Sequence, residues 1–142
     1  MSTRETQNKA IVRRFLEAFE ANDRSGFNEV LSPDLVAHTQ HIGDSANRET
    51  MLQGISMFHA AFSELHLTLE DLIAEGDRVA ARGTTRAVHT GNFMGASATG
   101  KQVTFSTMSV ERIQAGKIVE RWVNTDFMAL MQQLGLIPPP TR

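Results

Sequence analysis

The stretch KQVTFSTMSVERIQAGKIVERWVNTD, residues 101–126, decides the fold. Apolar and polar side chains alternate along it on both sides of Ala115-Gly116, a pair typical of a tight hairpin turn. Because successive side chains of a strand point to opposite faces, the alternation predicts strands over residues 101–113 and 117–125. The C-terminal half of the chain therefore contains a long antiparallel hairpin.

The same alternation continues upstream of this hairpin. Leucines alternate with polar residues from Leu65 onward, and Gly76-Asp77 has the composition of a turn. The pattern predicts one strand from residue 65 to this turn and another over 78–90, followed by a glycine-containing loop over 91–100. Long strands thus follow one another along the chain.

Helical patterns come before the strands. Ser2 and Glu5 have the spacing of a capping box, and the apolar residues that follow recur every three to four positions. The pattern predicts an amphipathic helix that ends near Asn22-Asp23, a short second helix that ends before Ser32-Pro33-Asp34, and a third that begins after Asn47. A short closing helix is expected after the last strand.

The order of these elements indicates the fold class. Residues 35–38 are expected to be extended, and apolar residues at helical spacing carry the third helix to Phe62. Helices that precede long hairpin strands argue for an α+β fold, with the helices packed on one face of a curved antiparallel sheet. Such a sheet wraps around the N-terminal helices like a cone, whose open end is a natural pocket. The chain length of 142 residues predicts a single domain over 1–142.

Composition excludes several classes of protein. With 14 basic and 16 acidic side chains, the formal net charge of -2 gives no support for nucleic-acid binding. Hydrophobic residues make up 41% of the chain, enough to build a core. The absence of cysteine excludes disulfides and thiolate metal sites. No apolar run reaches the roughly 18 residues of a membrane span, and the polar start is unlike a signal peptide. We expect a cytoplasmic protein with no membrane partner.

The last predicted strand carries the main candidate for catalysis. By alternation, Glu120, Trp122, Asn124 and Asp126 share one face. If this face looks into the cone, Asp126 lies beside an apolar wall, where a poorly hydrated carboxylate is a good general base for a carbon acid next to a carbonyl group. The structural alternative is that Asp126 caps the closing helix, because Asp is a favoured N-cap residue. The spacing leaves both roles open.

Further residues are candidates for binding a small apolar molecule in the pocket. Arg82 would bind a carboxylate or enolate oxygen if it points inward, and otherwise it is a solvated or ion-paired side chain. His38 follows an apolar segment and is a second candidate to enter the cone, and Asn124 shares the face of Asp126. The aromatic candidates for the cavity wall are Phe58, Phe105 and Trp122.

No motif in the sequence points to a bound metal or an organic cofactor. His38 and His41 lie close together but lack a third ligand at metal-binding spacing. The glycines between residues 91 and 100 form no phosphate-binding motif, and no serine has the G-x-S-x-G context of a hydrolase nucleophile. We therefore expect chemistry that needs no cofactor.

The other face of the sheet is expected to be an interface. Met108 and Val110 alternate with the residues assigned to the pocket, so they lie on the outer side of the sheet. Apolar side chains gathered on an outer face mark a contact surface. The expectation is a homodimer formed through the outer sheet face.

Several segments, taken together, resemble one family. They are HTGNFMG at 89–95, TGK at 99–101, GKIVERW at 116–122, the opening segment 8–19, LVAH at 35–38 and QQLG at 132–135. In this combination, and over nearly its whole length, the sequence resembles the SnoaL-like polyketide cyclases of the NTF2-like superfamily. The resemblance implies a cone-shaped α+β barrel, a deep apolar pocket and a dimer.

The resemblance also implies a role for Asp126. In the polyketide cyclases of this family, an aspartate at the end of the last strand is the acid/base of an intramolecular aldol ring closure that uses neither metal nor organic cofactor. Asp126, in WVNTDF, matches that aspartate. The antibiotic cyclases carry a histidine and a glutamine on the preceding strand, where this sequence has Ser109 and Thr107. The resemblance therefore does not extend to an anthracycline-type substrate.

Two other activities of the superfamily fit less well. Ketosteroid isomerases use a tyrosine, which is absent here, and epoxide-hydrolase-like members use an Asp-Arg-Asp group of which Asp126 and Arg82 supply only two members. The sequence thus predicts a cofactor-free acid/base enzyme that acts on a small apolar carbonyl compound by aldol cyclase or isomerase chemistry. The alternatives are a non-catalytic protein that binds a lipophilic small molecule in the same pocket, and a structural protein that docks a partner on the outer sheet face.

Overall fold

The computed structural model describes residues 2–39 and 45–139, so His41 lies outside the described residues. Within them, no helix is long and apolar enough to cross a membrane. The elements are α1 (Thr3–Ala21), α2 (Arg24–Val30), β1 (Leu31–Thr39), β2 (Ala46–Asn47), α3 (Arg48–Ala61), β3 (Phe62–Glu75), β4 (Arg78–His89), β5 (Gln102–Gln114), β6 (Lys117–Thr125) and α4 (Phe127–Gln133).

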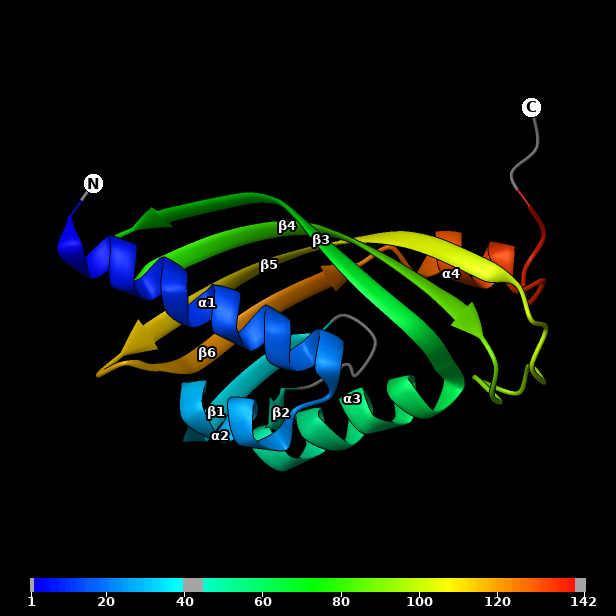
Figure 1. The fold of residues 1–142 in the computed structure, drawn as a ribbon, viewed down its shortest axis with the longest axis horizontal. Coiled ribbons are helices and arrows are strands. Elements are labelled where there is room, and N and C mark those ends of the chain that lie inside the picture. The colour runs from blue at the N-terminus through cyan, green and yellow to red at the C-terminus, as the bar shows by residue number, and fades with distance from the viewer. Residues whose placement is uncertain (1, 40–44, 140–142) are drawn as a thin grey trace.

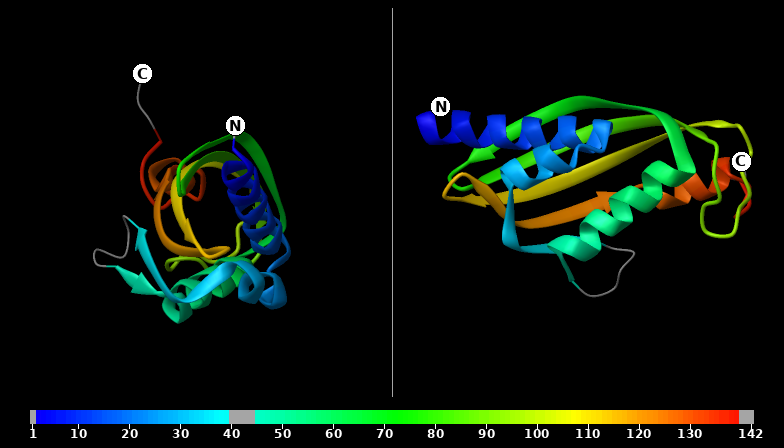
Figure 2. Two further views of the ribbon diagram at one scale, coloured as in Figure 1. Left: turned by 90° about the vertical axis from the view of Figure 1, so that its left-hand side faces the viewer. Right: turned by 60° about the horizontal axis from the view of Figure 1, so that its bottom comes forward.

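The strands form one six-stranded sheet in the order β2-β1-β6-β5-β4-β3. The long strands β3 to β6 pair antiparallel with their neighbours, whereas β1 lies parallel to β6. The sheet curves strongly, and α1 and α3 lie on its concave side (Figures 1 and 2). This confirms the predicted α+β fold with a curved sheet around the helices. The parallel pair departs from the antiparallel arrangement expected, because no turn in the sequence fixes the direction of β1 against β6.

Helix α1 forms where its capping box predicts. The Ser2 hydroxyl accepts a hydrogen bond from the N–H of Glu5, and the Glu5 carboxylate accepts one from the N–H of Ser2, both at 3.1 Å. The helix ends at Asn22, whose left-handed backbone (φ 51°) closes it. Val12 and Phe15 bury its apolar face almost completely. Each such burial contributes about 1.5–3 kcal/mol, so packing holds α1 more strongly than its cap does.

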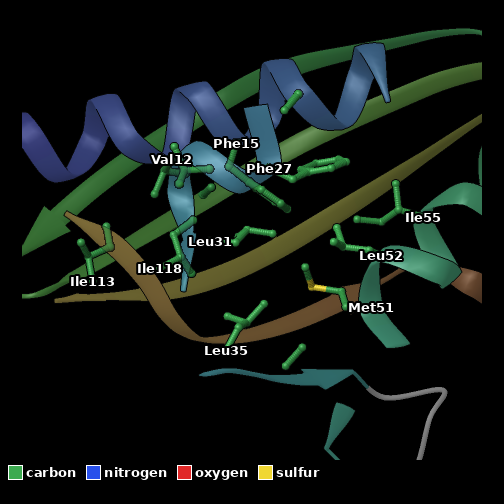
Figure 3. Close-up of a cluster of buried hydrophobic side chains, with 14 of the residues drawn as sticks. Val12, Phe15, Phe27, Leu31, Leu35, Met51, Leu52, Ile55, Ile113 and Ile118 are labelled. Atoms are coloured by element: carbon green, nitrogen blue, oxygen red, sulfur yellow. The ribbon is translucent and has the colours of Figure 1, made fainter. Parts of the chain in front are cut away.

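Two clusters of buried side chains hold the helices to the sheet. In the first, Phe15 of α1 packs on Phe27 of α2 with ring centroids 5.8 Å apart, and residues of β1 and α3 complete the layer (Figure 3). The second lies nearer α4 and includes Phe62, Phe105 and Leu130. Side chains from both clusters also line a cavity between the sheet and the helices.

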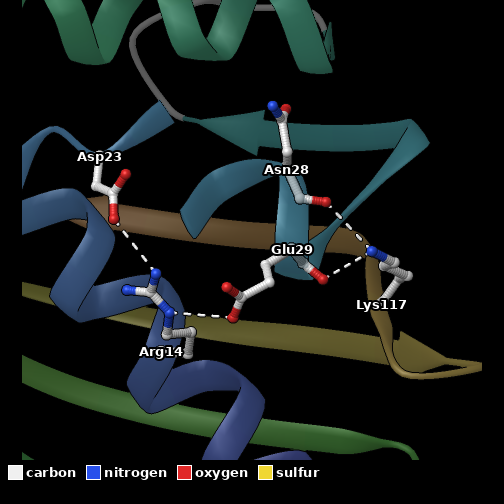
Figure 4. A network of polar contacts seen from close by, with 5 residues as sticks. All are labelled: Arg14, Asp23, Asn28, Glu29 and Lys117. Carbon is white, nitrogen blue, oxygen red and sulfur yellow. Dashed lines mark hydrogen bonds and ion pairs between the residues drawn. The ribbon is translucent and has the colours of Figure 1, made fainter. Parts of the chain in front are cut away.

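A polar network fixes α2 against α1 and the β5–β6 hairpin. Arg14 pairs with Asp23 at 3.3 Å and with Glu29 at 3.1 Å, and Lys117 donates to the main-chain carbonyls of Asn28 and Glu29 (Figure 4). The pKa of Asp23 is lowered, mainly by a backbone N–H of α2 and then by the Arg14 guanidinium. Exposed ion pairs contribute little free energy each, so this network sets the orientation of α2 more than its stability.

The boundary between the third helix and the next strand differs from the prediction. Helix α3 ends at Ala61, and β3 begins at Phe62 without a connecting loop. The start of β3 contains a register shift, and Glu64 adopts a left-handed conformation with φ 50°. Regular alternation therefore begins only at Leu65, which is where the sequence pattern becomes visible.

Strand β1 is longer than the extended segment predicted at 35–38. It begins at Leu31, directly after α2, and its register against β6 shifts between Leu31 and Val36. Pro33 lies inside this shift, where its missing N–H removes a hydrogen-bond donor that a regular strand would use. The proline thus hides the first half of the strand from a pattern-based prediction.

Candidate active site

A cavity of about 210 Å³ lies between the concave face of the sheet and the helices α1 and α3. Phe15 and Phe19 come from α1, Met51 and Ile55 from α3, and inward side chains of β3 to β6 complete the wall. Alternation along each strand places one set of side chains in this space and the other set outside. A concave, mostly apolar space with a few polar groups is the usual form of a small-molecule site.

The inward face of β6 is not the face predicted. Arg121, Val123 and Thr125 line the cavity, whereas Trp122 and Asn124 lie on the convex side of the sheet. The prediction that Trp122 shapes the cavity, and that Asn124 lies in it, is therefore wrong. The arginine was a poor guide, since a charged side chain usually marks the outer face of a strand.

The strand register gives the physical reason. Trp122 pairs with Val110 and Asn124 pairs with Met108, and residues that are directly paired across two strands share one face of the sheet. Met108 and Val110 lie on the outer face, as expected, together with Trp122 and Asn124. The predicted inner face is therefore correct for β5 but wrong for β6.

Four of the predicted binding residues meet on the convex side instead. Arg82, Trp122 and Asn124 line a second hollow there. The ring of His38 stacks on Trp122 with centroids 5.4 Å apart, and its Nε2 lies 2.8 Å from the carboxylate of Glu120. This hydrogen bond is the main cause that lowers the pKa of Glu120. The expectation that His38 enters the cavity is wrong, because its aromatic and acidic partners are on the other face.

Arg82 also takes its structural alternative. Its Nε lies 2.7 Å from a carboxylate oxygen of Asp71 on the neighbouring strand β3, and both side chains are about half exposed. An arginine held in this way on the convex side does not reach a ligand in the cavity. The predicted inward role of Arg82 is therefore wrong.

Asp126 is the N-cap of α4. Its carboxylate accepts a hydrogen bond from the N–H of Ala129 at 3.1 Å, and the residue is exposed. The expected poorly hydrated position is wrong, and the capping role left open by the sequence is the one observed. Its two chain neighbours, Thr125 and Phe127, nevertheless line the cavity, so Asp126 lies beside it.

The remaining two predicted residues do line the cavity. Phe58 of α3 and Phe105 of β5 meet edge to face, with ring centroids 5.9 Å apart. Edge-to-face packing of this kind is a favoured aromatic geometry. These rings give the cavity an aromatic wall, and their contribution to ligand binding stays a prediction.

The strongest polar feature of the cavity was missed by the sequence argument. Arg121 lines the cavity and forms a bidentate ion pair with Glu111, through Nε to Oε2 at 2.9 Å and Nη2 to Oε1 at 3.0 Å. The side chain of Glu111 is 0% exposed and that of Arg121 is 10% exposed. The signal was present in the sequence, because alternation places Glu111 on the same face as Phe105, and a carboxylate buried on that face is expected to be paired with a cation.

Hydroxyl groups form the rest of the polar lining. Thr85, Thr107, Ser109 and Thr125 come from three adjacent strands and all line the cavity. Thr39 also lines the cavity, and its buried hydroxyl has no hydrogen-bond partner among residues 2–39 and 45–139. A neutral hydroxyl both donates and accepts hydrogen bonds, so this lining suits a ligand that carries several oxygen atoms.

The described part of the chain contains no group of three or more His, Cys, Asp or Glu side chains placed to hold a metal ion. Comparison with known proteins then identifies the family. The sequence matches the family described as SnoaL-like polyketide cyclase over residues 9–134. The chain belongs to this family. A comparison with curated proteins gives no match.

Solved structures of SnoaL-like proteins have the same fold. AclR of Streptomyces galilaeus, described as a candidate hydroxylase, is 30% identical over 97% of this chain and 87% of that chain, with a TM-score of 0.89. IdmH of Streptomyces antibioticus, described as a candidate polyketide cyclase, is 29% identical over 91% and 99% of the two chains, with a TM-score of 0.84. A candidate SnoaL-like cyclase from Jannaschia sp. CCS1, 23% identical over 99% and 98%, has a TM-score of 0.87 and shows the fold alone. These likenesses confirm the predicted NTF2-like architecture.

Membership in the SnoaL-like family supports a cyclase-like function in general terms. The cavity of this SnoaL-like protein has its own chemistry, since Ser109 and Thr107 line it where the resemblance would place a histidine and a glutamine. Their hydroxyls are smaller and do not titrate near neutral pH. The polar lining on β5 and β6 therefore consists of neutral hydroxyls and the guanidinium of Arg121.

Proposed function

We propose that this SnoaL-like protein binds a small, largely apolar carbonyl compound in its cavity and acts on it by cyclase-like or isomerase-like acid/base chemistry. The cavity carries the proposal: its walls are aromatic and aliphatic, and its polar groups are hydroxyls and one charged side chain, Arg121, among the described lining residues. Such a surface fits the carbon skeleton of a ligand while a few donors orient its oxygen atoms.

Asp126 is the proposed acid/base. Its neighbours Thr125 and Phe127 line the cavity, so its carboxylate would need to turn away from the N–H of Ala129 to reach a bound ligand. Giving up an N-cap costs about 1 kcal/mol, which the binding energy of a ligand easily offsets. The carboxylate then takes a proton from the carbon next to the carbonyl group, and the electron pair of that C–H bond forms an enolate. In a cyclase the enolate carbon attacks a second carbonyl of the same molecule, and the proton returns to the new alkoxide.

The proposal is tested with 2-tetralone, a bicyclic ketone with acidic α-protons. NMR in D₂O measures how fast the protein exchanges these protons, and calorimetry measures binding. Gly54→Leu is the matched obstruction, because Gly54 lines the cavity and a Cβ there would meet no atom within 4 Å. We expect the parent protein to make exchange faster than in buffer, and Gly54→Leu to bind 2-tetralone more weakly than the parent does. Exchange no faster than in buffer would contradict the acid/base chemistry, and binding that Gly54→Leu leaves unchanged would contradict binding in the cavity.

Non-catalytic binding of a lipophilic molecule is the second candidate. One observation favours it: the carboxylate of Asp126 is exposed and engaged as a helix cap. A protein of this kind would bind 2-tetralone with the same sensitivity to Gly54→Leu but would not accelerate proton exchange. The exchange measurement therefore separates the two candidates.

A homodimer through the outer sheet face remains part of the proposal. Ile73 and Met108 on this face are 64% and 60% exposed, and the Asp71–Arg82 pair beside them carries both signs of charge. A second copy related by a two-fold axis brings the same apolar and charged groups to the contact. Sedimentation velocity is expected to show a dimer that Met108→Glu weakens. A parent chain that sediments as a monomer would contradict this.

A further inference from the structure

Neither the pairing of the strands nor the acid/base proposal gives a role to the ion pair between Glu111 and Arg121. The two residues face each other across β5 and β6, and both are almost completely removed from solvent. The carboxylate of Glu111 receives three contacts from the guanidinium, at 2.9, 3.0 and 3.2 Å, through Nε and Nη2. This bidentate geometry fixes the plane of the guanidinium at the cavity wall.

The third nitrogen of Arg121 has no strong acceptor among the described residues. Its Nη1 lies 3.6 Å from the sulfur of Met51, which itself lines the cavity. A thioether is only a weak hydrogen-bond acceptor. One face of the guanidinium lies over the ring of Phe15, with 4.6 Å between Cζ and the ring centroid. Arg121 therefore keeps donor capacity at the cavity wall, and its orientation is held by groups on two sides.

The charge balance decides which ligand oxygen these donors suit. Glu111 and Arg121 together carry no net charge, and the described residues that line the cavity are uncharged apart from Arg121. A carboxylate ligand would add an uncompensated negative charge to an enclosed, largely apolar space, which is strongly unfavourable. A neutral carbonyl oxygen accepts the same hydrogen bond without adding charge. The N–H of Arg121 is then not left buried without an acceptor.

We propose that Arg121 is the specificity-determining residue of the cavity: Nη1 donates to a neutral carbonyl oxygen of the ligand, and Glu111, as a positioning residue, selects ketones and esters against carboxylates. The inference rests on the proposed function, because it assumes that the ligand occupies this cavity.

The test compares two probes with one ring system, 2-acetylnaphthalene and 2-naphthoate, by calorimetry at neutral pH. The parent protein is expected to bind the ketone at least about tenfold more tightly than the carboxylate. Glu111→Gln keeps the shape of the partner but leaves the positive charge of Arg121 uncompensated. This variant is expected to move the preference by about tenfold or more toward the carboxylate.

A double variant keeps the test sound if Glu111→Gln folds poorly. Replacing a buried ion pair by apolar residues on both sides is often neutral for stability, so Glu111→Leu combined with Arg121→Met is expected to fold and to bind the ketone about tenfold more weakly. Equal affinity of the parent for both probes, or a preference that Glu111→Gln leaves unchanged, would overturn the inference while leaving ligand binding intact. Failure of both probes to bind in a Gly54-dependent way would instead overturn the proposed function and the inference with it.

Discussion

Substitution of Asp126 separates its observed structural role from its proposed chemical role. Asparagine is as good an N-cap as aspartate but cannot take a proton, whereas alanine provides neither function. In the free protein the carboxylate accepts the N–H of Ala129. Asp126→Asn should therefore leave stability unchanged, and Asp126→Ala should reduce it by about 1 kcal/mol.

The size of the alanine effect follows from how α4 is held. Leu130 is fully buried in the second core cluster, and the side chain of Gln133 bonds both main-chain groups of Thr104 at 2.8 Å. These contacts keep the helix in place, so loss of the cap frays its first turn and does not release it. For a chain of this length, about 1 kcal/mol corresponds to a fall of about 3 °C in Tm.

Two assays read the two roles. Thermal unfolding compares both variants with the parent, and deuterium exchange of 2-tetralone reports base catalysis. We expect Asp126→Asn to unfold at the same temperature as the parent but to lose the accelerated exchange. Asp126→Ala is expected to lose the accelerated exchange and also to unfold at a lower temperature. Exchange by Asp126→Asn at the parent rate would refute the acid/base role. Destabilisation of Asp126→Asn to the level of the alanine variant would refute the capping argument.

Three further predictions concern stability. The hydrogen bond from His38 lowers the pKa of Glu120 from its usual 4.5, so its contribution to stability is present above that pH and is lost as the pH falls through the lowered value. The free energy of unfolding in urea, measured between about pH 5 and pH 3, should therefore depend less on pH in Glu120→Gln than in the parent. An unchanged pH dependence would contradict this prediction. Gly26→Ala should destabilise by about 1 kcal/mol or more, because a Cβ there would lie 2.8 Å from the Cβ of Ala18. Gly54→Ala, in an open helical position, should stabilise by about 0.5–1 kcal/mol. Equal effects of the two alanine substitutions in chemical denaturation would show that packing is not the cause.

Features that depend on neighbouring residues were predictable from the sequence. The capping box at Ser2 and Glu5 and the hairpin turn at Ala115-Gly116 act over a few residues, and both form as expected. The order of the predicted helices and strands along the chain was enough to predict an α+β fold. The parallel pairing of β1 with β6 joins segments about 85 residues apart, and no local pattern encodes it.

The site was harder to predict because alternation defines two faces but not which one is buried. Trp122 and Asp126 suggested the wrong inner face for β6. The tryptophan stacks with His38 on the convex side, and the aspartate caps α4. The buried arginine is explained only by its partner on the other strand of the hairpin. Glu111 on the same face as Phe105 was the available clue, and reading the two strands as a pair would have placed Arg121 inside.

A crystal structure of the protein soaked with 2-acetylnaphthalene tests the central claim most directly. The account predicts the ring system against Phe58 and Phe105 in the cavity, with its carbonyl oxygen at hydrogen-bond distance from Nη1 of Arg121. Ligand density in the convex hollow beside Trp122, with the cavity unchanged, would contradict it.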